Sequence, residues 1–182
     1  MKIEIPLSKA NRLINHGPTV LITSQSGGRP NIMTAAWQTP VSKDPPLVAV
    51  SIAPGRYSHQ LIEESREFVV NVPSHVLLKE VHGCGTVSGQ EVDKFRKFGL
   101  TPEDAAHVGA PLIKECIAHL ECRLYDSFGI GDHTLFVGQV LAASVEEDLF
   151  DDFLKVDDPR AKTLHHLGSN KYTCPDQRIE VD

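Results

Sequence analysis

The chain has 182 residues, of which 41% are hydrophobic and 23% are charged, and its formal net charge is −6. This length and composition are typical of one globular domain with a sizeable core, and they show no compositional extreme. A protein that binds nucleic acid through its phosphates needs a basic face, so the acidic balance argues against a nucleic-acid partner.

Signals for export or membrane insertion are also missing from the sequence. The N-terminus lacks the apolar run of a signal peptide, and no window reaches the apolar length that spans a membrane. The four cysteines form no CxxC pair, which in a chain of this size favours free thiols in a reducing compartment. We therefore expect a cytoplasmic protein without a membrane partner.

The first part of the chain has the patterns of extended structure. Residues 19–24 (TVLITS) predict a strand, residues 25–30 a turn, and residues 31–38 (NIMTAAWQ) further extended structure. The prolines within residues 39–46 (TPVSKDPP) predict a loop. The continuous apolar run of residues 47–52 (LVAVSI) is typical of a buried strand.

Helical patterns are few and short. Residues 54–65 (PGRYSHQLIEES) predict a short helix, and residues 67–72 (EFVVNV) predict a strand that Pro73 ends. Residues 74–83 (SHVLLKEVHG) predict a second helix, and a third is expected over about 88–99.

A long antiparallel hairpin is expected in the second half of the chain. Residues 116–125 (CIAHLECRLY) alternate strictly, which places Cys122 on one face of a strand and Glu121 on the other. Residues 129–132 (GIGD) predict a turn, and residues 133–147 return as the partner strand. One buried and one outward face are typical of an antiparallel sheet.

The order of these elements predicts the fold class. It lacks the regular strand–helix alternation of a doubly wound sheet, and antiparallel hairpins that bury one face usually close into barrels or sandwiches. The chain contains no repeat and no linker. We therefore expect one mainly β domain over residues 1–182, with helices packed outside and a loose tail from about residue 175.

Residues 82–95 (HGCGTVSGQEVDKF) contain several residue types that could carry chemistry. A metal site is not expected, because His82 and Cys84 lack the second ligand pair that structural zinc requires. No signature of a nucleophile surrounds Cys84, so a small buried thiol is the better interpretation. The glycine spacing GxGxxxG misses the dinucleotide fingerprint by one residue and follows a predicted helix instead of a strand.

The same stretch has the pattern of a helix start. Ser88 and Glu91 form a capping box, and Val87 and Val92 have the spacing of a hydrophobic staple. Lys94 would lie in the second turn, where its ammonium could reach an anion at the helix N-terminus. A phosphate there would need the loop hydroxyls, the first-turn N–H groups and this lysine together.

Four stretches follow one another in a specific order along the chain. They are NIMTAAWQTPVSKDPPLVAVSIAPGRYSHQLI, EFVVNV, CGTVSGQEVDKF and GDHTLFVGQV. Together they resemble the flavin reductase-like family of FMN-binding split barrels, from about Pro18 to about Tyr172. That family includes flavoredoxins and NAD(P)H-dependent flavin or ferric reductases. The resemblance implies an antiparallel, Greek-key-like split β-barrel with peripheral helices, and a homodimer with FMN at the barrel edge near the subunit interface.

The resemblance also implies which residues contact the FMN. The backbone of residues 31–37 would run along the isoalloxazine ring, where its donors stabilise negative charge on the reduced ring. Arg56 suits the phosphate because its planar fork gives paired donors, whereas Lys94 would act as a point charge. The implied cofactor contacts are Asn31, Met33, Thr34, Ala35, Trp37, Ser51, Ile52, Ala53, Arg56, Ser58, Gly85, Thr86, Ser88 and Lys94.

Taken singly, several of these residues also fit purely structural roles. Asn31 could start a strand, Trp37 could fill a core or an interface, and Arg56 could be a solvated turn residue. His133 matches a histidine that in some family reductases lies near the open face of the flavin, where it would orient a nicotinamide or supply a proton. It also fits a hydrogen-bonded strand end. Gln90 stands where many relatives carry arginine, which predicts weaker electrostatic binding of the phosphate.

The implied function is an FMN-dependent oxidoreductase. It would take a hydride from NADH or NADPH onto the bound flavin and pass electrons to a flavin, ferric or protein acceptor. Two alternatives stay open. One is a flavoredoxin-type electron-transfer protein with a redox protein partner and no NAD(P)H reaction of its own, and the other is a non-catalytic FMN-binding protein.

Overall fold

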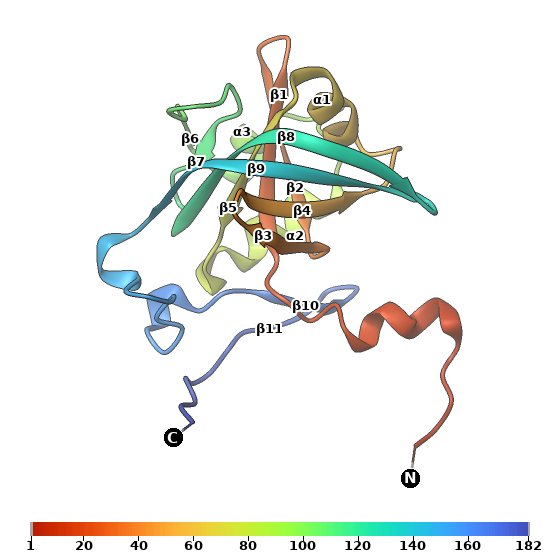
Figure 1. Ribbon diagram of the computed structural model, residues 1–182, viewed down its shortest axis with the longest axis vertical. Coiled ribbons are helices and arrows are strands. Elements are labelled where there is room, and N and C mark those ends of the chain that lie inside the picture. The colour runs from red at the N-terminus through yellow and green to blue at the C-terminus, as the bar shows by residue number, and fades with distance from the viewer. Residues whose placement is uncertain (1, 182) are drawn as a thin grey trace.

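The computed structural model describes residues 2–181, and a large antiparallel sheet with few helices forms its centre (Figure 1). The predicted mainly β class is therefore confirmed. No helix among residues 2–181 is long and apolar enough to cross a membrane. In sheet order the seven strands are β2 (Arg29–Ala35), β1 (Val20–Ser26), β5 (Glu67–Val72), β8 (Ala118–Ile130), β9 (His133–Val145), β4 (Pro46–Ile52) and β3 (Gln38–Lys43).

Short helices and two small hairpins surround this sheet. The hairpins are β6 (Pro102–Glu103) with β7 (Leu112–Ile113), and β10 (His165–Gly168) with β11 (Lys171–Thr173). The helices are η1 (Leu7–Leu13), α1 (Tyr57–Ser65), η2 (His75–Leu77), α2 (Leu78–Thr86), α3 (Lys94–Phe98), η3 (Glu147–Leu149) and η4 (Pro159–Ala161).

The two edge strands of the sheet are neighbours in the sequence. Strand β2 pairs only with β1, and β3 pairs only with β4, yet only Ala36 and Trp37 separate them. The N–H of Ser51 donates to the carbonyl of Trp37 at 2.9 Å, which continues the β3–β4 ladder up to this connection. The sheet therefore has to curl until its edges meet, and residues 36–37 form the seam of the resulting barrel.

Both faces of the sheet are covered near strand β1, which explains its continuous apolar sequence. Because successive side chains of a strand point to opposite faces, Ile22 lies inside the barrel with Phe68 and Phe136. Leu21 points outward and packs with Val81 of α2.

Gly138 of β9 leaves room for a large side chain inside the barrel. A Cβ at this position would lie 2.4 Å from Cζ of Phe68, so the ring occupies the space that any other residue would need.

One predicted loop is a strand in the structure. Residues 39–46 were expected to form a loop because of their prolines, but β3 runs to Lys43 and pairs with β4 through a tight turn. The pairing shifts register between Pro40 and Ser42. An edge strand with a bulge tolerates proline because one side of its backbone needs no partner.

The prediction that a helix begins near Ser88 is also wrong. Helix α2 continues through residues 83–86, and the next helix, α3, begins only at Lys94. The hydroxyl of Ser88 accepts from the N–H of Gln90 at 3.2 Å, which forms a local turn in place of a capping box. Asp93 caps α3 instead, because its carboxylate accepts from the N–H of Arg96 at 3.1 Å.

The predicted strand is present as part of β8, but Glu121 does not lie on an outward, solvated face of it. The residue is only 7% exposed. Its carboxylate accepts N–H bonds from Ala106 and His107, the latter at 2.6 Å. The loop that contains these two residues covers the outer face of the sheet, so the alternation in the sequence does not mark a solvated face here.

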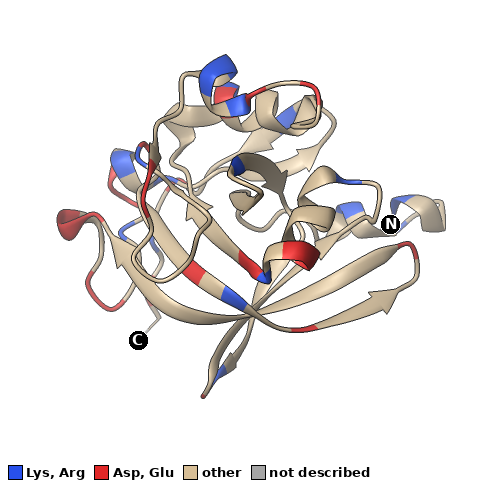
Figure 2. Cartoon of the chain, turned by 90° about the horizontal axis from the view of Figure 1, so that it is seen from above, with Lys and Arg blue, Asp and Glu red and all other residues tan. Residues whose placement is uncertain are grey.

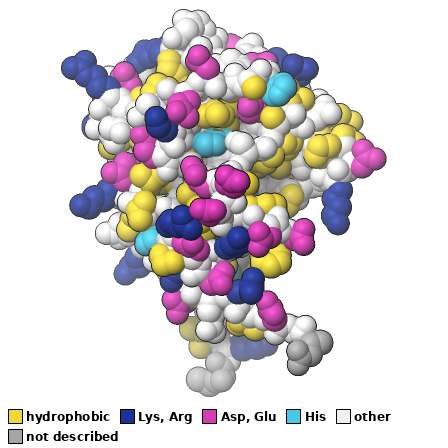
Figure 3. Space-filling model, turned by 90° about the vertical axis from the view of Figure 1, so that its left-hand side faces the viewer, with side chains coloured by type: hydrophobic (Ala, Val, Ile, Leu, Met, Phe, Trp, Pro, Cys, Tyr) yellow, Lys and Arg dark blue, Asp and Glu magenta, His cyan; other side chains and the backbone are white. Residues whose placement is uncertain are grey.

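Charged residues of both signs are distributed around the barrel. Figure 2 shows most strand positions uncharged, with Lys, Arg, Asp and Glu mainly on the helices and loops. The acidic run of residues 146–153 is exposed except at Leu149, and it forms ion pairs with nearby basic residues. Lys155 contacts Asp151 at 3.1 Å, and acidic and basic side chains alternate on the face that Figure 3 shows.

The core makes a prediction about stability. Replacing Phe68, which is fully buried, by alanine should lower the free energy of unfolding by about 3–5 kcal/mol, because transfer and cavity terms add. Urea unfolding followed by circular dichroism measures this. The control is Phe153→Ala, because Phe153 is 49% exposed. This variant should lower the free energy of unfolding by less than about 1 kcal/mol. Equal losses in the two variants would contradict this assignment of the core.

Candidate functional site

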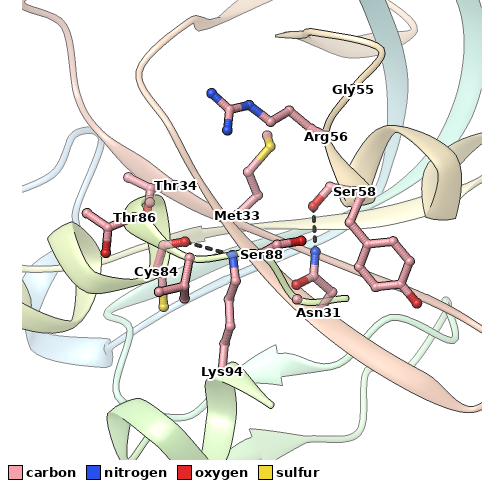
Figure 4. Close-up of a pocket in the computed structure, with 14 residues that line it drawn as sticks. Asn31, Met33, Thr34, Gly55, Arg56, Ser58, Cys84, Thr86, Ser88 and Lys94 are labelled. Carbon is pink, nitrogen blue, oxygen red and sulfur yellow. Dashed lines mark hydrogen bonds between the residues drawn. The ribbon is translucent and has the colours of Figure 1, made fainter. Parts of the chain in front are cut away.

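Two adjoining hollows open beside the seam of the barrel. The helix-side hollow has a volume of about 250 Å³, and the seam-side hollow about 360 Å³. They share Met33, Thr34 and Arg56, so one elongated molecule could occupy both. In Figure 4, Arg56 and Lys94 approach the helix-side hollow from opposite sides, with Met33 between them.

The lining of each hollow comes from distant parts of the chain. The helix-side hollow is lined by Asn31, Met33, Thr34, Gly55, Arg56, Tyr57, Ser58, Cys84, Gly85, Thr86, Val87, Ser88, Gly89 and Lys94. The seam-side hollow is lined by Asn11, Arg12, Asn15, Met33, Thr34, Ala35, Ala36, Trp37, Ser51, Ile52, Ala53, Arg56, His133 and His166. Every site residue predicted from the sequence lines one of the two, whereas the part that each plays toward a ligand stays a prediction.

The N-terminus of α1 borders the helix-side hollow. Arg56 is the N-cap residue, and Tyr57 and Ser58 follow in the first turn, where backbone N–H groups have no acceptor within the helix. Asn31 donates to the hydroxyl oxygen of Ser58 at 2.7 Å, which leaves the hydroxyl hydrogen of Ser58 free for another acceptor. This arrangement offers hydrogen-bond donors and the positive end of a helix dipole to an anion.

Contact with side chains of strand β2 explains two glycines, one in the last turn of α2 and one in the turn after it. A Cβ on Gly89 would lie 1.9 Å from the side-chain oxygen of Asn31, and one on Gly85 would lie 3.3 Å from Cβ of Thr34. Only a residue without a side chain fits at position 89. The end of α2 and the turn after it therefore lie directly against strand β2.

Lys94 holds the same two elements together. Its ammonium donates to the carbonyl of Ile32 in β2 and to that of Cys84 in α2, each at 2.7 Å, and the residue is 6% exposed. Burial lowers the pKa of Lys94, the nearby thiol of Cys84 raises it, and the charge of Arg56 lowers it further. Two of its three N–H donors are thus used inside the protein, and one is left for a ligand.

Cys84 lines the helix-side hollow as a neutral thiol. It is 1% exposed, and burial raises its pKa to about 12, against a smaller lowering effect of Lys94. The nucleophile is the thiolate, so this site does not activate the cysteine. The interpretation of Cys84 as a small buried thiol agrees with this environment, and all four cysteines are free.

Gln90 does not line either hollow. Its carbonyl and that of Gly89 accept hydrogen bonds from the guanidinium of Arg29, at 3.0 and 2.8 Å. This guanidinium also lies over the ring of Tyr57, 5.9 Å from its centroid. Arg29 therefore supplies a positive charge beside the loop, at a position that the sequence did not single out.

Trp37 and His133 form an aromatic pair at the seam-side hollow. Their ring centroids lie 4.9 Å apart with an angle of 35° between the planes. Nδ1 of His133 lies 2.7 Å from the carboxylate of Asp132, which fixes the orientation of the imidazole ring. The hydrogen bond with His133, followed by Coulombic attraction, lowers the pKa of Asp132.

Residues near both ends of the chain complete the seam-side hollow, and the sequence reasoning missed them. Asn11, Arg12 and Asn15 come from η1 and the residues just after it, and His166 comes from β10. No motif connects these two segments. The only available signal was chemical: an arginine and two amides close together in an N-terminal segment without a strand pattern.

A family model for the flavin reductase like domain matches residues 12–166. The chain belongs to the flavin reductase-like family. An uncharacterized protein of Archaeoglobus fulgidus is 48% identical over 84% of this chain and 85% of its own length. An NADH-dependent FAD reductase of Streptomyces globisporus is 33% identical over 73% of each chain.

Solved structures of this family share the fold over nearly the whole chain. An FMN-binding protein from Thermus thermophilus is 31% identical with a TM-score of 0.83, covering 100% of this chain and 98% of its own. A flavoredoxin from Methanosarcina acetivorans is 28% identical with a TM-score of 0.85, covering 100% and 95%. A Shewanella frigidimarina protein described as having a split barrel domain is 18% identical with a TM-score of 0.85, covering 98% and 93%. The split barrel predicted from the resemblance is confirmed.

Thiol reactivity tests the environment of the flavin reductase-like site. With iodoacetamide near neutral pH, Cys174 should react first because it alone is half-buried, while Cys84, Cys116 and Cys122 are buried and react slowly. Burial raises the pKa of all three thiols, so little thiolate is present. Mass spectrometry after timed quenching measures the order, with unfolded protein as the control. Alkylation of Cys84 as fast as that of Cys174 would contradict the buried thiol.

Proposed function

We propose that this chain binds FMN across the two hollows and uses it as an NAD(P)H-dependent oxidoreductase. The phosphate end would lie in the helix-side hollow and the ring along the seam. The observation that carries this proposal is the shared lining of the hollows by Met33, Thr34 and Arg56, next to the N-terminus of α1.

The helix-side hollow fits a phosphate. The first-turn N–H groups of α1, the guanidinium of Arg56 and the hydroxyl of Ser58 are donors, and Lys94 adds a positive charge. None of the residues that line this hollow is Asp or Glu. Glu91 and Asp93, which are close in sequence to the lining residues Ser88 and Lys94, do not line it.

The seam fits the edge of a flat polar ring. Strand β2 pairs only with β1, so alternate backbone groups along it face away from the sheet. The carbonyl of Ile32 is one of them, since it accepts from Lys94, and by the period of two the N–H of Thr34 faces the same way. Bound FMN supplies the exchange of electrons between donor and acceptor. The backbone donors of this strand would stabilise negative charge on the reduced ring.

The aromatic pair of Trp37 and His133 would position the co-substrate. Trp37 is 38% exposed, so it is available as a flat surface and is not core filler. Because Nδ1 of His133 is held by Asp132, its Nε2 is the nitrogen free to hydrogen-bond a nicotinamide or to move a proton. His133 is thus our proposed catalytic residue, and NADH or NADPH the proposed co-substrate.

A second candidate function is electron transfer of the flavoredoxin type. The likeness to the Methanosarcina acetivorans flavoredoxin over the whole chain favours it. In that case a redox protein would replace the pyridine nucleotide as electron donor. A non-catalytic FMN-binding role is the remaining alternative, and the likeness to the Thermus thermophilus FMN-binding protein supports it.

We further propose that the protein acts as a cytoplasmic homodimer. Three apolar side chains of the β8–β9 hairpin, Tyr125, Phe128 and Ile130, are 58%, 49% and 59% exposed. They lie on the hairpin that also carries His133. A second subunit would cover them near the seam-side hollow, and free cysteines suit a reducing compartment.

Anaerobic reduction tests the proposed function. We expect the purified protein, loaded with FMN, to lose its visible flavin absorbance when NADH or NADPH is added. Flavin that stays oxidised with both nucleotides but is reduced through a redox protein would identify electron transfer instead. Absence of FMN binding would contradict both proposals. Free FMN with the same nucleotides is the control.

Lys94 should contribute to FMN affinity. Lys94→Met removes a buried charge and two hydrogen bonds that hold β2 against α2, and we expect the Kd for FMN to rise by about tenfold to a hundredfold. Quenching of FMN fluorescence on binding measures this. The control is Lys97→Met on the same helix, where the lysine is exposed and does not line the hollow.

A stability measurement separates binding from folding in the Lys94 variant. Urea unfolding without FMN shows how much of the loss belongs to the fold, and unfolding with excess FMN shows how much stabilisation the ligand still provides. An unchanged Kd in Lys94→Met would assign Lys94 a purely structural part.

A further inference from the structure

Two segments that are far apart in the chain, residues 11–19 and residues 164–168, form the outer rim of the seam-side hollow. The N–H of Thr19 donates to the carbonyl of Leu164 at 2.6 Å, and Nδ1 of His165 lies 2.7 Å from the carbonyl of His16. Pro18 also forms an isolated bridge with His165. Figure 1 shows η1 and the β10–β11 hairpin together beneath the barrel. These contacts hold the residues after η1 against β10.

Arg12 has a defined position in this rim. A Cβ added to Gly168 would lie 2.9 Å from Nη1 and 3.1 Å from Cζ of Arg12, so the guanidinium packs on the backbone of β10. Gly168 has a φ of 132°, a conformation that favours glycine. Arg12 and His166, which lies in the same strand as Gly168, both line the seam-side hollow.

Within the described residues, no acidic side chain pairs with the arginines at this hollow. Within residues 2–181, neither Arg12 nor Arg56 forms an ion pair, and no Asp or Glu lines the seam-side hollow. The chain as a whole has more acidic than basic residues, 24 against 18. An arginine without a carboxylate partner in an acidic protein favours an anionic ligand.

An amide in the rim also lacks a partner. Asn15 lines the seam-side hollow and is 8% exposed, and within residues 2–181 its side-chain oxygen has no hydrogen-bond partner. An amide oxygen accepts hydrogen bonds, so this group does not bind phosphate oxygens, and it fits a hydroxyl donor such as that of a ribose.

The phosphate of FMN does not account for Arg12. That phosphate is proposed to lie in the helix-side hollow, which Arg12, Asn15 and His166 do not line. The rim lies instead around the hollow that Trp37 and His133 line, where the nicotinamide is proposed to bind. A pyridine dinucleotide whose nicotinamide reaches this aromatic pair has its diphosphate further out, toward the rim.

We propose that Arg12 binds the diphosphate of the pyridine dinucleotide. This inference rests on the proposed function and names the part of the co-substrate that this rim recognises. Arg12 supplies paired donors to phosphate oxygens, whereas Nε2 of His166 already donates to the carbonyl of Ser169 at 2.9 Å. The diphosphate is common to NADH and NADPH, so the rim does not distinguish between them.

Steady-state kinetics of Arg12→Gln tests the proposal. The KM for both NADH and NADPH should rise by about tenfold or more, with kcat and the Kd for FMN nearly unchanged, because uniform binding of the co-substrate is lost. The matched control is Lys9→Gln, which removes the same charge from η1 at a residue that does not line the hollow. Arg12→Lys keeps the charge without the planar fork and should give an intermediate KM.

A hydride donor without phosphates sharpens the test. With 1-benzyl-1,4-dihydronicotinamide, wild type and Arg12→Gln should react at the same rate. An equal loss with this donor would show that Arg12 only shapes the hollow, which would overturn the proposal. An effect confined to NADPH would assign Arg12 to the ribose phosphate instead and would also overturn it.

Binding of ADP-ribose separates this inference from the proposed function. The compound carries the diphosphate without nicotinamide, and calorimetric titration of the FMN-loaded protein should detect it for wild type and for Lys9→Gln but only weakly for Arg12→Gln. If the protein binds ADP-ribose through Arg12 yet no nucleotide reduces the flavin, the proposed reductase function fails and the rim site remains. If ADP-ribose does not bind wild type, the rim site is wrong whatever the kinetics show.

Discussion

The connection between the two edge strands is the constraint on which the rest of the structure depends. Strands β2 and β3 lie at opposite edges of the sheet, and residues 36–37 alone join them. The sheet therefore closes through the covalent chain, and within residues 2–181 no ladder joins β2 to β3. Because an edge strand keeps unpaired backbone groups, this closure leaves a polar slot at the seam. Both hollows open beside this seam, which is where we propose that a flat polar ligand binds.

The wall opposite the seam is held by a different kind of contact. The end of α2 and the turn after it lie against β2 because Gly85 and Gly89 leave room for the side chains of Thr34 and Asn31. Lys94 then joins both elements through carbonyls, one of which lies in the last turn of α2. A cation near a helix C-terminus is electrostatically favourable, so this lysine also offsets the negative end of α2 that faces the hollow. The positive end of α1 meets the same hollow from the other side.

Charge is distributed unevenly between the site and the remaining surface. The protein is acidic overall, yet the two hollows are lined by arginine, lysine and histidine without a carboxylate. Within a concave site of low dielectric such charges act more strongly than on an exposed surface. An anionic ligand in either hollow would therefore meet a positive lining, although the chain as a whole is acidic. Membership of the flavin reductase-like family agrees with this distribution.

The sequence could predict most of the strands and many of the residues that line the two hollows. Alternating and continuous apolar runs follow from which face of a strand is buried, and the order of the family's stretches indicated the strand and loop residues of the hollows but not those from η1 and β10. Local patterns predicted the structure less well where the same residues fit two different local structures. Ser88 and Glu91 have the spacing of a capping box, but the hydroxyl bonds Gln90 and the helix begins at Lys94. Proline likewise indicated a loop where an edge strand accepts it.

By itself the sequence determined a mainly β domain of the flavin reductase-like type, because periodicity and motif order are properties of the chain. Only the tertiary structure decided which helix N-terminus faces the hollow, that Lys94 is buried on two carbonyls, and that Arg12 and His166 line the same hollow. These outcomes depend on contacts between residues far apart in the chain. These contacts form only after the sheet has closed into a barrel, when other segments cover the surfaces that remain. A local sequence pattern carries no information about that step.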